Sequence, residues 1–133
     1  MIHSKTFDVI ILGLGPVGLL ACNVFGKMGY QVLGIDKVRQ AYNFPRAIAL
    51  DDEIVRIVQS VGLSKPLLKH LKPFEGMELL DLNGQVLTRG SIDFPSGYVS
   101  NHFFFHQPTL EHILREGSER FSSVTMIYET EID

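Results

Sequence analysis

The segment FDVIILGLGPVG, from Phe7 to Gly18, decides the fold of this chain. Its first half is a short and nearly continuous apolar run rich in β-branched residues, which predicts a strand buried on both faces, as in a parallel sheet. Glycines and a proline follow directly. Pro16 falls where a first helical turn would begin, and there its missing N–H costs no hydrogen bond. The segment therefore predicts a strand, a tight turn and a helix in that order.

The predicted helix leads back to a second strand. Gly29 is a suitable stop for the helix. The segment YQVLGID, residues 30–36, then has the apolar character of another short strand. The residues expected to form the inner face of the helix recur at helical spacing: Val17, Leu20, Ala21, Val24 and Met28.

The glycines of the turn follow the pattern G-x-G-x-x-G, at positions 13, 15 and 18. Gly13 permits a tight turn, Gly15 lets a pyrophosphate approach the backbone without a Cβ in the way, and Gly18 lets the helix pack closely against the strand. The N-terminus of the helix adds unpaired N–H groups and the positive end of a dipole. The pattern in this context predicts a dinucleotide site, with a turn that merely packs as the alternative.

Asp36 stands at the end of the second predicted strand. A carboxylate at this place accepts hydrogen bonds from ribose hydroxyls. Its charge would repel a 2′-phosphate and so disfavours NADP, although Lys37 and Arg39 soften that inference. Because NAD and FAD are bound through the same pattern, both cofactors stay open at this point.

Length and composition are those of an ordinary globular chain. The 133 residues are enough for about one domain. The net charge of −3 offers no basic excess for nucleic acid, and no apolar run reaches the ~20 residues that span a bilayer. One cysteine excludes an internal disulfide framework and fits a reducing compartment, which we expect to be the cytoplasm.

The segment FPRAIALDDEIVRIVQ, residues 44–59, predicts an extended link followed by a helix. Pro45 biases Phe44 toward an extended backbone. Asp51 is a good N-cap, and further acids in the first turn suit the helix dipole. The acids are therefore expected to cap the helix rather than to act in catalysis. The apolar face of this helix is predicted to comprise Ile54, Ile57, Val58 and Val61, with Gly62 at its end.

Arg46 precedes this helix and has two interpretations. A charged side chain at the surface commonly forms an ion pair, here with Asp51 or Asp52. A planar guanidinium also suits a phosphate-rich ligand, because it donates several hydrogen bonds in a fixed geometry. The residues alone favour the ion pair.

Several stretches together resemble a known family. ILGLGPVGLL (residues 11–20), Asp36 and PRAIALDDE (residues 45–53) ahead of an apolar helix are similar to the N-terminal part of the FAD-dependent aromatic-ring hydroxylases, which are flavoprotein monooxygenases. HQPTLEHIL (residues 106–114) is a second match. The closest resemblance is to the 3-(3-hydroxyphenyl)propionate hydroxylase type, and it runs from Phe7 to about Phe121.

The resemblance implies FAD as the cofactor and a role for each matching residue. The three glycines would hold the pyrophosphate and Asp36 the adenosine ribose. Arg46 would lie along the pyrophosphate or ribityl region. Gln107 would approach the flavin, although a loop amide ahead of a helix that starts with a proline is an equal alternative. The residues implied to contact the cofactor are Gly13, Gly15, Pro16, Val17, Gly18, Asp36, Lys37, Arg46 and Gln107.

The rest of the chain predicts further elements. GMELLDLNGQVLTRG, residues 76–90, reads as a β-hairpin with a type I′ turn at Asn83-Gly84, packed beside the nucleotide-binding sheet. NHFFFHQPTLEHILREGSERF, residues 101–121, predicts an aromatic strand and a helix from about Pro108. SVTMIYE, residues 123–129, predicts a final strand at the edge of the same sheet. The helix is expected to bury Leu110, Ile113 and Leu114, later joined by Phe121.

Neither the histidines nor the cysteine predicts a reactive site. His102 and His106 lie in an extended run, where a spacing of four does not bring side chains together. No cysteine or carboxylate cluster completes a metal site, so we expect no metal. Cys22 lies on the first helix among core positions and is expected to be a small buried hydrophobe.

The fold class is therefore α/β, with a Rossmann-like FAD-binding βαβ unit, a parallel sheet and an added β-hairpin. The resembled family has two further FAD signatures, an Asp-Gly and a Gly-Asp dipeptide, and neither occurs in this sequence. We therefore expect residues 1–133 to be a partial FAD-binding domain, the N-terminal portion of a longer architecture. Its origin could be a deliberately shortened chain, a truncated reading frame or a split subunit.

In the resembled family, NADH or NADPH transiently reduces FAD, and the reduced flavin and O2 hydroxylate an aromatic, phenolic acid-like substrate. No residue of this chain is a convincing acid or base, so no catalytic residue is assigned. The isolated chain is not expected to be competent alone. An NAD-dependent dehydrogenase domain and a non-catalytic dinucleotide-binding module are the alternatives. A second copy or a completing partner chain is compatible with an incomplete domain, because such a domain exposes apolar surface.

Overall fold

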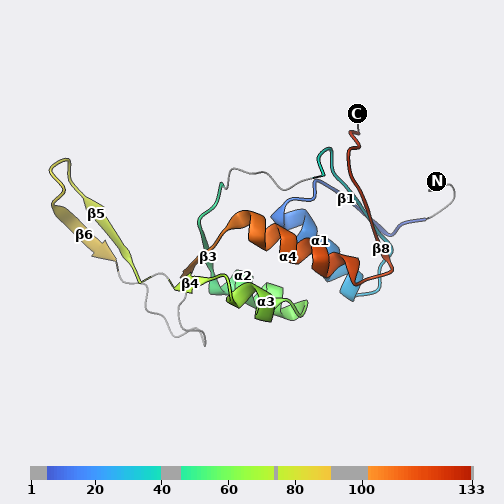
Figure 1. Ribbon diagram of the computed structural model, residues 1–133, viewed down its shortest axis with the longest axis horizontal. Coiled ribbons are helices and arrows are strands. Elements are labelled where there is room, and N and C mark those ends of the chain that lie inside the picture. The colour runs from blue at the N-terminus through green and yellow to red at the C-terminus, as the bar shows by residue number, and fades with distance from the viewer. Residues whose placement is uncertain (1–5, 40–45, 74, 91–101, 133) are drawn as a thin grey trace.

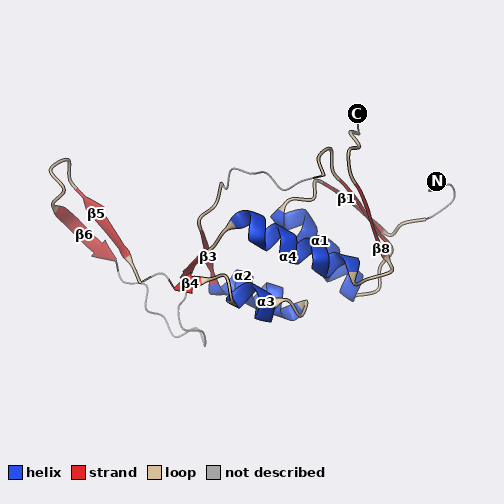
Figure 2. Ribbon diagram, in the orientation of Figure 1, coloured by secondary structure: helices blue, strands red, loops and turns tan. Residues whose placement is uncertain are grey.

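The computed structural model describes residues 6–39, 46–73, 75–90 and 102–132 (Figure 1). Helices and strands both occur along this length, and four strands follow one another between the third and the fourth helix (Figure 2). The predicted extended conformation of Phe44 before Pro45 lies outside the described residues. In chain order the elements are β1 (Val9–Leu12), α1 (Pro16–Lys27), β2 (Val32–Ile35), β3 (Ala49–Asp51), α2 (Asp52–Ser60), α3 (Ser64–Leu68), β4 (Lys72–Pro73), β5 (Met77–Leu80), β6 (Val86–Gly90), β7 (His102–Phe104), α4 (Gln107–Glu119) and β8 (Val124–Ile127).

A parallel sheet in the order β1-β2-β8 forms one layer of the fold. Val32 is the partner of Val9 on one side and of Val124 on the other. Helix α1 connects β1 to β2, so the predicted βαβ unit is confirmed. Strand β8 pairs with β2 and is an edge strand of this sheet within the described residues. The predicted position of the final strand is therefore confirmed.

Only one face of this sheet is covered by helix within the described residues. Helix α1 packs on that face, and α4 lies along α1 (Figure 1). Val9 and Ile11 pack against the core, whereas Ile10 and Leu12 on the opposite face are 60% and 66% exposed. The prediction that the first strand is buried on both faces is therefore wrong, because the described segments supply no second layer.

The inner face of α1 differs from the predicted one. The predicted residues include Val17 and Met28, which are 82% and 62% exposed. Leu20 and Val24 pack against the core as predicted. The centre of the inner face is nevertheless shifted, because α1 lies between the sheet and α4. The buried residues of α1 are Leu19, Cys22, Asn23 and Gly26.

A polar contact joins α1 to α4 inside the core. The amide nitrogen of Asn23 donates to the carbonyl oxygen of Leu114 at 2.7 Å and to Oγ of Ser118 at 2.8 Å. A Cβ on Gly117 would lie 2.6 Å from Oδ1 of Asn23, so only glycine lets the helices approach this closely. The hydrogen bonds remove the cost of burying the amide.

A second layer packs on the other side of α4. It contains α2, α3 and a small antiparallel sheet in the order β3-β7-β4. Phe103 on β7 and Val55 and Val58 on α2 are fully buried there. The predicted inner face of α4 is confirmed, because Leu110, Ile113 and Leu114 all belong to the core.

Strands β5 and β6 form the predicted hairpin, but the hairpin stands apart from the parallel sheet (Figure 1). All residues of both strands are exposed. The prediction that the hairpin packs beside the nucleotide-binding sheet is therefore wrong. The turn signal at Asn83-Gly84 specified two paired strands and contained no information about a third partner.

The turn of the hairpin also differs from the predicted type I′. Gly84 has a φ of +80°, whereas the φ of Asn83 is not positive. A type I′ turn requires a positive φ at both central residues. The carbonyl of Asp81 accepts from the N–H of Gly84 at 3.1 Å, and its Oδ1 accepts from the N–H groups of Asn83 and Gln85. This is a type I turn followed by a left-handed glycine, which the side chain of Asp81 stabilises.

Among the described residues, no helix has the length and apolar character required to cross a bilayer.

The N-cap of α2 provides a test of the fold. Oδ1 of Asp51 accepts from the N–H of Ile54 at 3.0 Å, which confirms the predicted cap. We expect Asp51→Ala to lower the free energy of unfolding by about 1 kcal/mol, because the partly buried N–H of Ile54 then loses its acceptor. Urea unfolding followed by circular dichroism measures this change. Glu53→Ala, an exposed acid of the same turn, is the control and should cost less; equal losses would contradict the cap.

Cys22 provides a second test. Its side chain is fully buried, and desolvation raises the pKa of the thiol from 9.0 to about 11. The folded protein therefore holds the thiol proton more tightly than the unfolded chain, and folding stability should fall as the pH rises from 9 to 11. At pH 8 we expect an aromatic disulfide reagent to label Cys22 only after denaturation. Labelling of the native chain at the rate of the denatured chain would refute this burial.

Candidate cofactor-binding site

The three glycines of the turn between β1 and α1 meet three different requirements. Gly13 has a φ of +90°, which favours glycine. A Cβ on Gly18 would lie 1.9 Å from the carbonyl oxygen of Gly13, so the helix can start here only with glycine at this position. A Cβ on Gly15 would meet no atom of the described residues within 4 Å. Gly15 is therefore not required by the fold, and the space beside it is open to a ligand.

In the part of the chain that the structure describes, no side chain caps the N-terminus of α1. Gly15 is the N-cap and offers no side-chain hydrogen bond, and the first turn contains no acid. Helix α2 is the opposite case, with Asp51 as cap and Asp52 and Glu53 in the first turn. The first N–H groups of a helix have no partner within the helix. Those of α1 consequently form an uncapped, positively polarised surface at the carboxyl end of β1.

Asp36 links the two ends of the βαβ unit. Its Oδ2 accepts from the N–H of Leu14 at 2.6 Å, and its Oδ1 accepts from the N–H of Val38 at 3.0 Å. The carboxylate thus ties the glycine turn to the end of β2. Each oxygen keeps further lone pairs for hydroxyl donors.

A cleft of about 450 Å³ opens beside this turn, within the range of ligand sites. Basic side chains from three separate segments line it: Lys37 after β2, Arg46 before β3 and Arg115 on α4. Arg115 also lies over the ring of Tyr128, 4.7 Å from its centroid. The cleft therefore combines an uncapped helix N-terminus with several cationic groups, an arrangement suited to an anion.

Gln107 closes one side of the cleft from the start of α4. Its Oε1 accepts from the N–H groups of Arg46 and Ala47 at 3.0 and 3.2 Å, and only 9% of the residue is exposed. The amide therefore holds the segment that carries Arg46. The alternative of a loop-supporting amide is therefore what the structure shows, and Gln107 also lines the cleft. Its approach to a flavin stays a prediction.

The acids near Arg46 have partners of their own. Asp51 caps α2, and Oδ2 of Asp52 accepts from Arg56 at 2.9 Å. Arg46 lines the cleft. Its position is thus compatible with a role toward a ligand.

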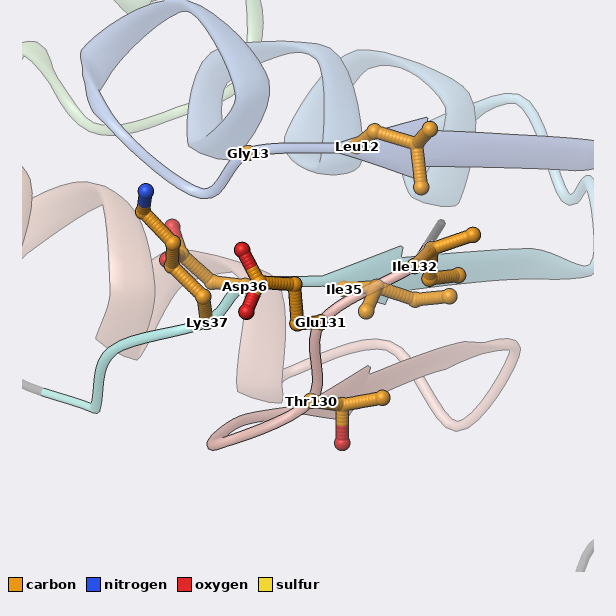
Figure 3. A pocket seen from close by; sticks show the side chains of 8 residues that line it. All are labelled: Leu12, Gly13, Ile35, Asp36, Lys37, Thr130, Glu131 and Ile132. Carbon is orange, nitrogen blue, oxygen red and sulfur yellow. The ribbon is translucent and has the colours of Figure 1, made fainter.

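A second cleft of about 400 Å³ adjoins the first (Figure 3). Leu12, Ile35 and Ile132 form its apolar end, and Asp36 and Lys37 lie at its polar end (Figure 3). Both clefts share Asp36 and Lys37, so they meet at the end of β2. An apolar recess next to a cleft with cationic groups suits the chemistry of a ligand that has an apolar and an anionic part.

Most of the residues predicted from sequence come together at these clefts. Val17 does not line either cleft and is 82% exposed, and Gly18 packs against Gly13 instead. Glu111 and Arg115 were missed, although they follow Gln107 by one and two helical turns and share its face. The predicted residues that line a cleft are Gly13, Gly15, Pro16, Asp36, Lys37, Arg46 and Gln107.

The comparison with protein families matches residues 6–133 to the family described as FAD binding domain. Among curated proteins, the chain is 40% identical over 134 residues to 3-(3-hydroxy-phenyl)propionate/3-hydroxycinnamic acid hydroxylase 1 from Burkholderia vietnamiensis. This match covers 98% of the chain and 21% of the relative. The chain therefore spans about a fifth of the length of that relative.

Solved structures share the fold. PqsL from Pseudomonas aeruginosa, in complex with 2-aminobenzoylacetate, superimposes with a TM-score of 0.83 at 21% identity, over 97% of this chain and 35% of that one. The flavin-dependent monooxygenase PieE, in complex with FAD and substrate, gives a TM-score of 0.77 at 20% identity, over 92% and 24%. At these identities the likeness concerns the fold alone. Together the comparisons confirm the resemblance to the FAD-dependent aromatic-ring hydroxylases.

Proposed function

Because the chain belongs to the FAD binding domain family, we propose that its two adjoining clefts hold FAD and that it serves as the FAD-binding part of a flavin-dependent aromatic-ring monooxygenase. Residues 1–133 would then be part of a larger FAD-binding unit, as the curated relative is about five times as long. The cytoplasm remains our expected compartment.

The observation that carries this proposal is the uncapped N-terminus of α1 beside Gly15. Among the described residues, no side chain fills the space where a Cβ of Gly15 would stand, and no acid of the first turn neutralises the helix dipole. A pyrophosphate would accept hydrogen bonds from the first N–H groups of α1. The residues present therefore fit the group that the family binds.

The other lining residues divide the cofactor between them. Asp36 would accept from the adenosine ribose while it keeps its bonds to the backbone of Leu14 and Val38. The apolar recess at Leu12 and Ile132 would receive the adenine base. Lys37 and Arg46 would offset the charge of the phosphates, and Gly13 and Pro16 would shape the backbone around them.

The chemistry of the reaction belongs to FAD, which supplies hydride acceptance and oxygen activation when it is bound. This chain's own residues would bind and orient the adenosine and pyrophosphate. NADH or NADPH as the reductant, and a phenolic acid-like substrate, come to this chain from the resembled family. The described clefts contain no residue that we assign to catalysis.

The test of the function is the identity of the bound cofactor. We expect the purified chain, once denatured, to release FAD that chromatography identifies, or to quench the fluorescence of added FAD if it is purified empty. Released NAD would overturn the proposal in favour of a dehydrogenase domain. A chain that is empty and binds neither cofactor would favour a non-catalytic module.

Two glycine variants separate binding from folding. We expect Gly15→Ala to keep the unfolding free energy within ~0.5 kcal/mol of the parent chain, because the new methyl group meets open space. The same methyl group would stand where the pyrophosphate approaches, so FAD affinity should fall at least about tenfold, as expected for the loss of one good hydrogen bond.

Gly18→Ala is the matched variant, because its methyl group would strike the carbonyl of Gly13. We expect it to destabilise the fold as well as the site. Urea unfolding and FAD fluorescence titration measure the two effects. Unchanged FAD affinity in a folded Gly15→Ala chain would show that the pyrophosphate does not lie at this turn.

A further inference from the structure

Glu111 is a buried carboxylate next to the cationic cleft. It lies on α4, one turn after Gln107, and only 4% of the residue is exposed. Its Oε1 accepts from Nε2 of Gln107 at 2.9 Å. A carboxylate that lines an anion-binding cleft repels the ligand, so its presence there requires another reason.

The reason lies in the two ends of the Gln107 amide. Its oxygen faces two backbone donors, the N–H groups of Arg46 and Ala47, and its nitrogen faces Glu111. If the amide were turned by 180°, its NH2 group would face two donors and its oxygen would face a carboxylate. An ionised carboxylate only accepts hydrogen bonds, so Glu111 excludes that orientation.

From this geometry we propose that Glu111 is a positioning residue of the cofactor site. Through one charge-assisted hydrogen bond it fixes the amide of Gln107, and Gln107 in turn holds the backbone of Arg46 and Ala47 at the edge of the cleft. Glu111 thus acts on FAD through Gln107 and the backbone at residues 46–47, and itself makes no contact with the phosphates. The link to FAD rests on the proposed function, whereas the hydrogen-bond relay rests on the structure of the chain alone.

The relay connects parts of the chain that are far apart. Residues 46 and 107 are separated by 61 positions, and the hydrogen bond between them is partly buried. Gln107 and Glu111 are four residues apart on one helix, where side chains at this spacing are neighbours. Helix α4 therefore fixes the positions of Gln107 and Glu111 relative to each other. Through the hydrogen bonds of Gln107, it also fixes the backbone of the segment that carries Arg46.

Replacement of Glu111 by methionine and by glutamine tests the relay. Glu111→Met keeps the length of the side chain and removes the acceptor, whereas Glu111→Gln keeps an acceptor and removes the charge. In the chain without cofactor, we expect Glu111→Met to speed hydrogen exchange of the Arg46 and Ala47 amides about tenfold, the effect of one hydrogen bond of ordinary strength. Two-dimensional NMR of the 15N-labelled chain resolves these amides.

The other variants set the scale of this measurement. Glu111→Gln should stay within about threefold of the parent chain, because its amide oxygen can still accept from Gln107. Glu116→Met makes the same replacement on the exposed side of α4, where the carboxylate is 67% exposed, and should leave the exchange at Arg46 and Ala47 unchanged. The amides of Leu114 and Ser118 inside α4 should stay protected in all variants.

A second readout links the relay to the cofactor. FAD affinity, measured by quenching of flavin fluorescence, should be about tenfold weaker in Glu111→Met than in Glu111→Gln, because both variants lose the repelling charge and only glutamine keeps the acceptor. Gln107→Met removes the other end of the relay and should speed the same two amides at least as much. This variant keeps the test decisive if Glu111→Met does not fold.

Three results would overturn the inference in part or in whole. Unchanged exchange at Arg46 and Ala47 in both methionine variants would show that the relay does not hold this segment. Equal acceleration in Glu111→Gln and Glu111→Met would show that the hydrogen bond to Glu111 is not the cause. Exchange that follows the expected order, while the parent chain binds no FAD, would overturn the proposed function and leave the relay intact.

Discussion

The close contact between Gly18 and the carbonyl of Gly13 is the constraint on which the rest of the structure depends. Any side chain at position 18 would occupy the space of that carbonyl oxygen. With glycine at position 18, α1 can begin shortly after the carboxyl end of β1 and pack against the sheet. Its N-terminus then points at the same edge where β2 delivers Asp36, whose carboxylate accepts from the N–H of Leu14 and locks the turn to the second strand.

The second half of the site depends on how α4 is held. The buried amide of Asn23 ties α1 to α4, and the glycine at 117 lets the two helices approach. Because α4 is fixed in this way, Gln107 at its start reaches the segment of Arg46. The cleft therefore depends on the contact between α1 and α4. A substitution at Asn23 or Gly117 that moves α4 would also move Gln107 and the segment of Arg46.

Sequence reasoning succeeded where the information was local. The glycine spacing and Pro16 specify the turn and the start of α1, since each acts on neighbours within a few residues, and Asp51 capped α2 as expected. Asp36 was found from its place at the end of the second strand, although its bond to Leu14 spans 22 positions. It failed where long-range packing decides. The phase of α1 depends on α4, so Asn23 and Gly26 face inward instead of Val17 and Met28. The position of the hairpin could not be read from its turn signal. Glu111 was missed because an acid on a helix reads as a surface residue until its burial is known.

Gln107 holds the segment of residues 46 and 47 through its backbone, and this has a consequence for which substitutions the site can accept during evolution. The amide oxygen accepts from the backbone N–H groups of residues 46 and 47, and these bonds do not depend on which side chains stand there. The side chain at position 46, which lines the cleft, can therefore be exchanged without loss of the hydrogen bonds that hold this segment. The position of the backbone and the chemistry of the side chain at residues 46 and 47 are therefore independent. A substitution can change the side chain while the backbone keeps its place.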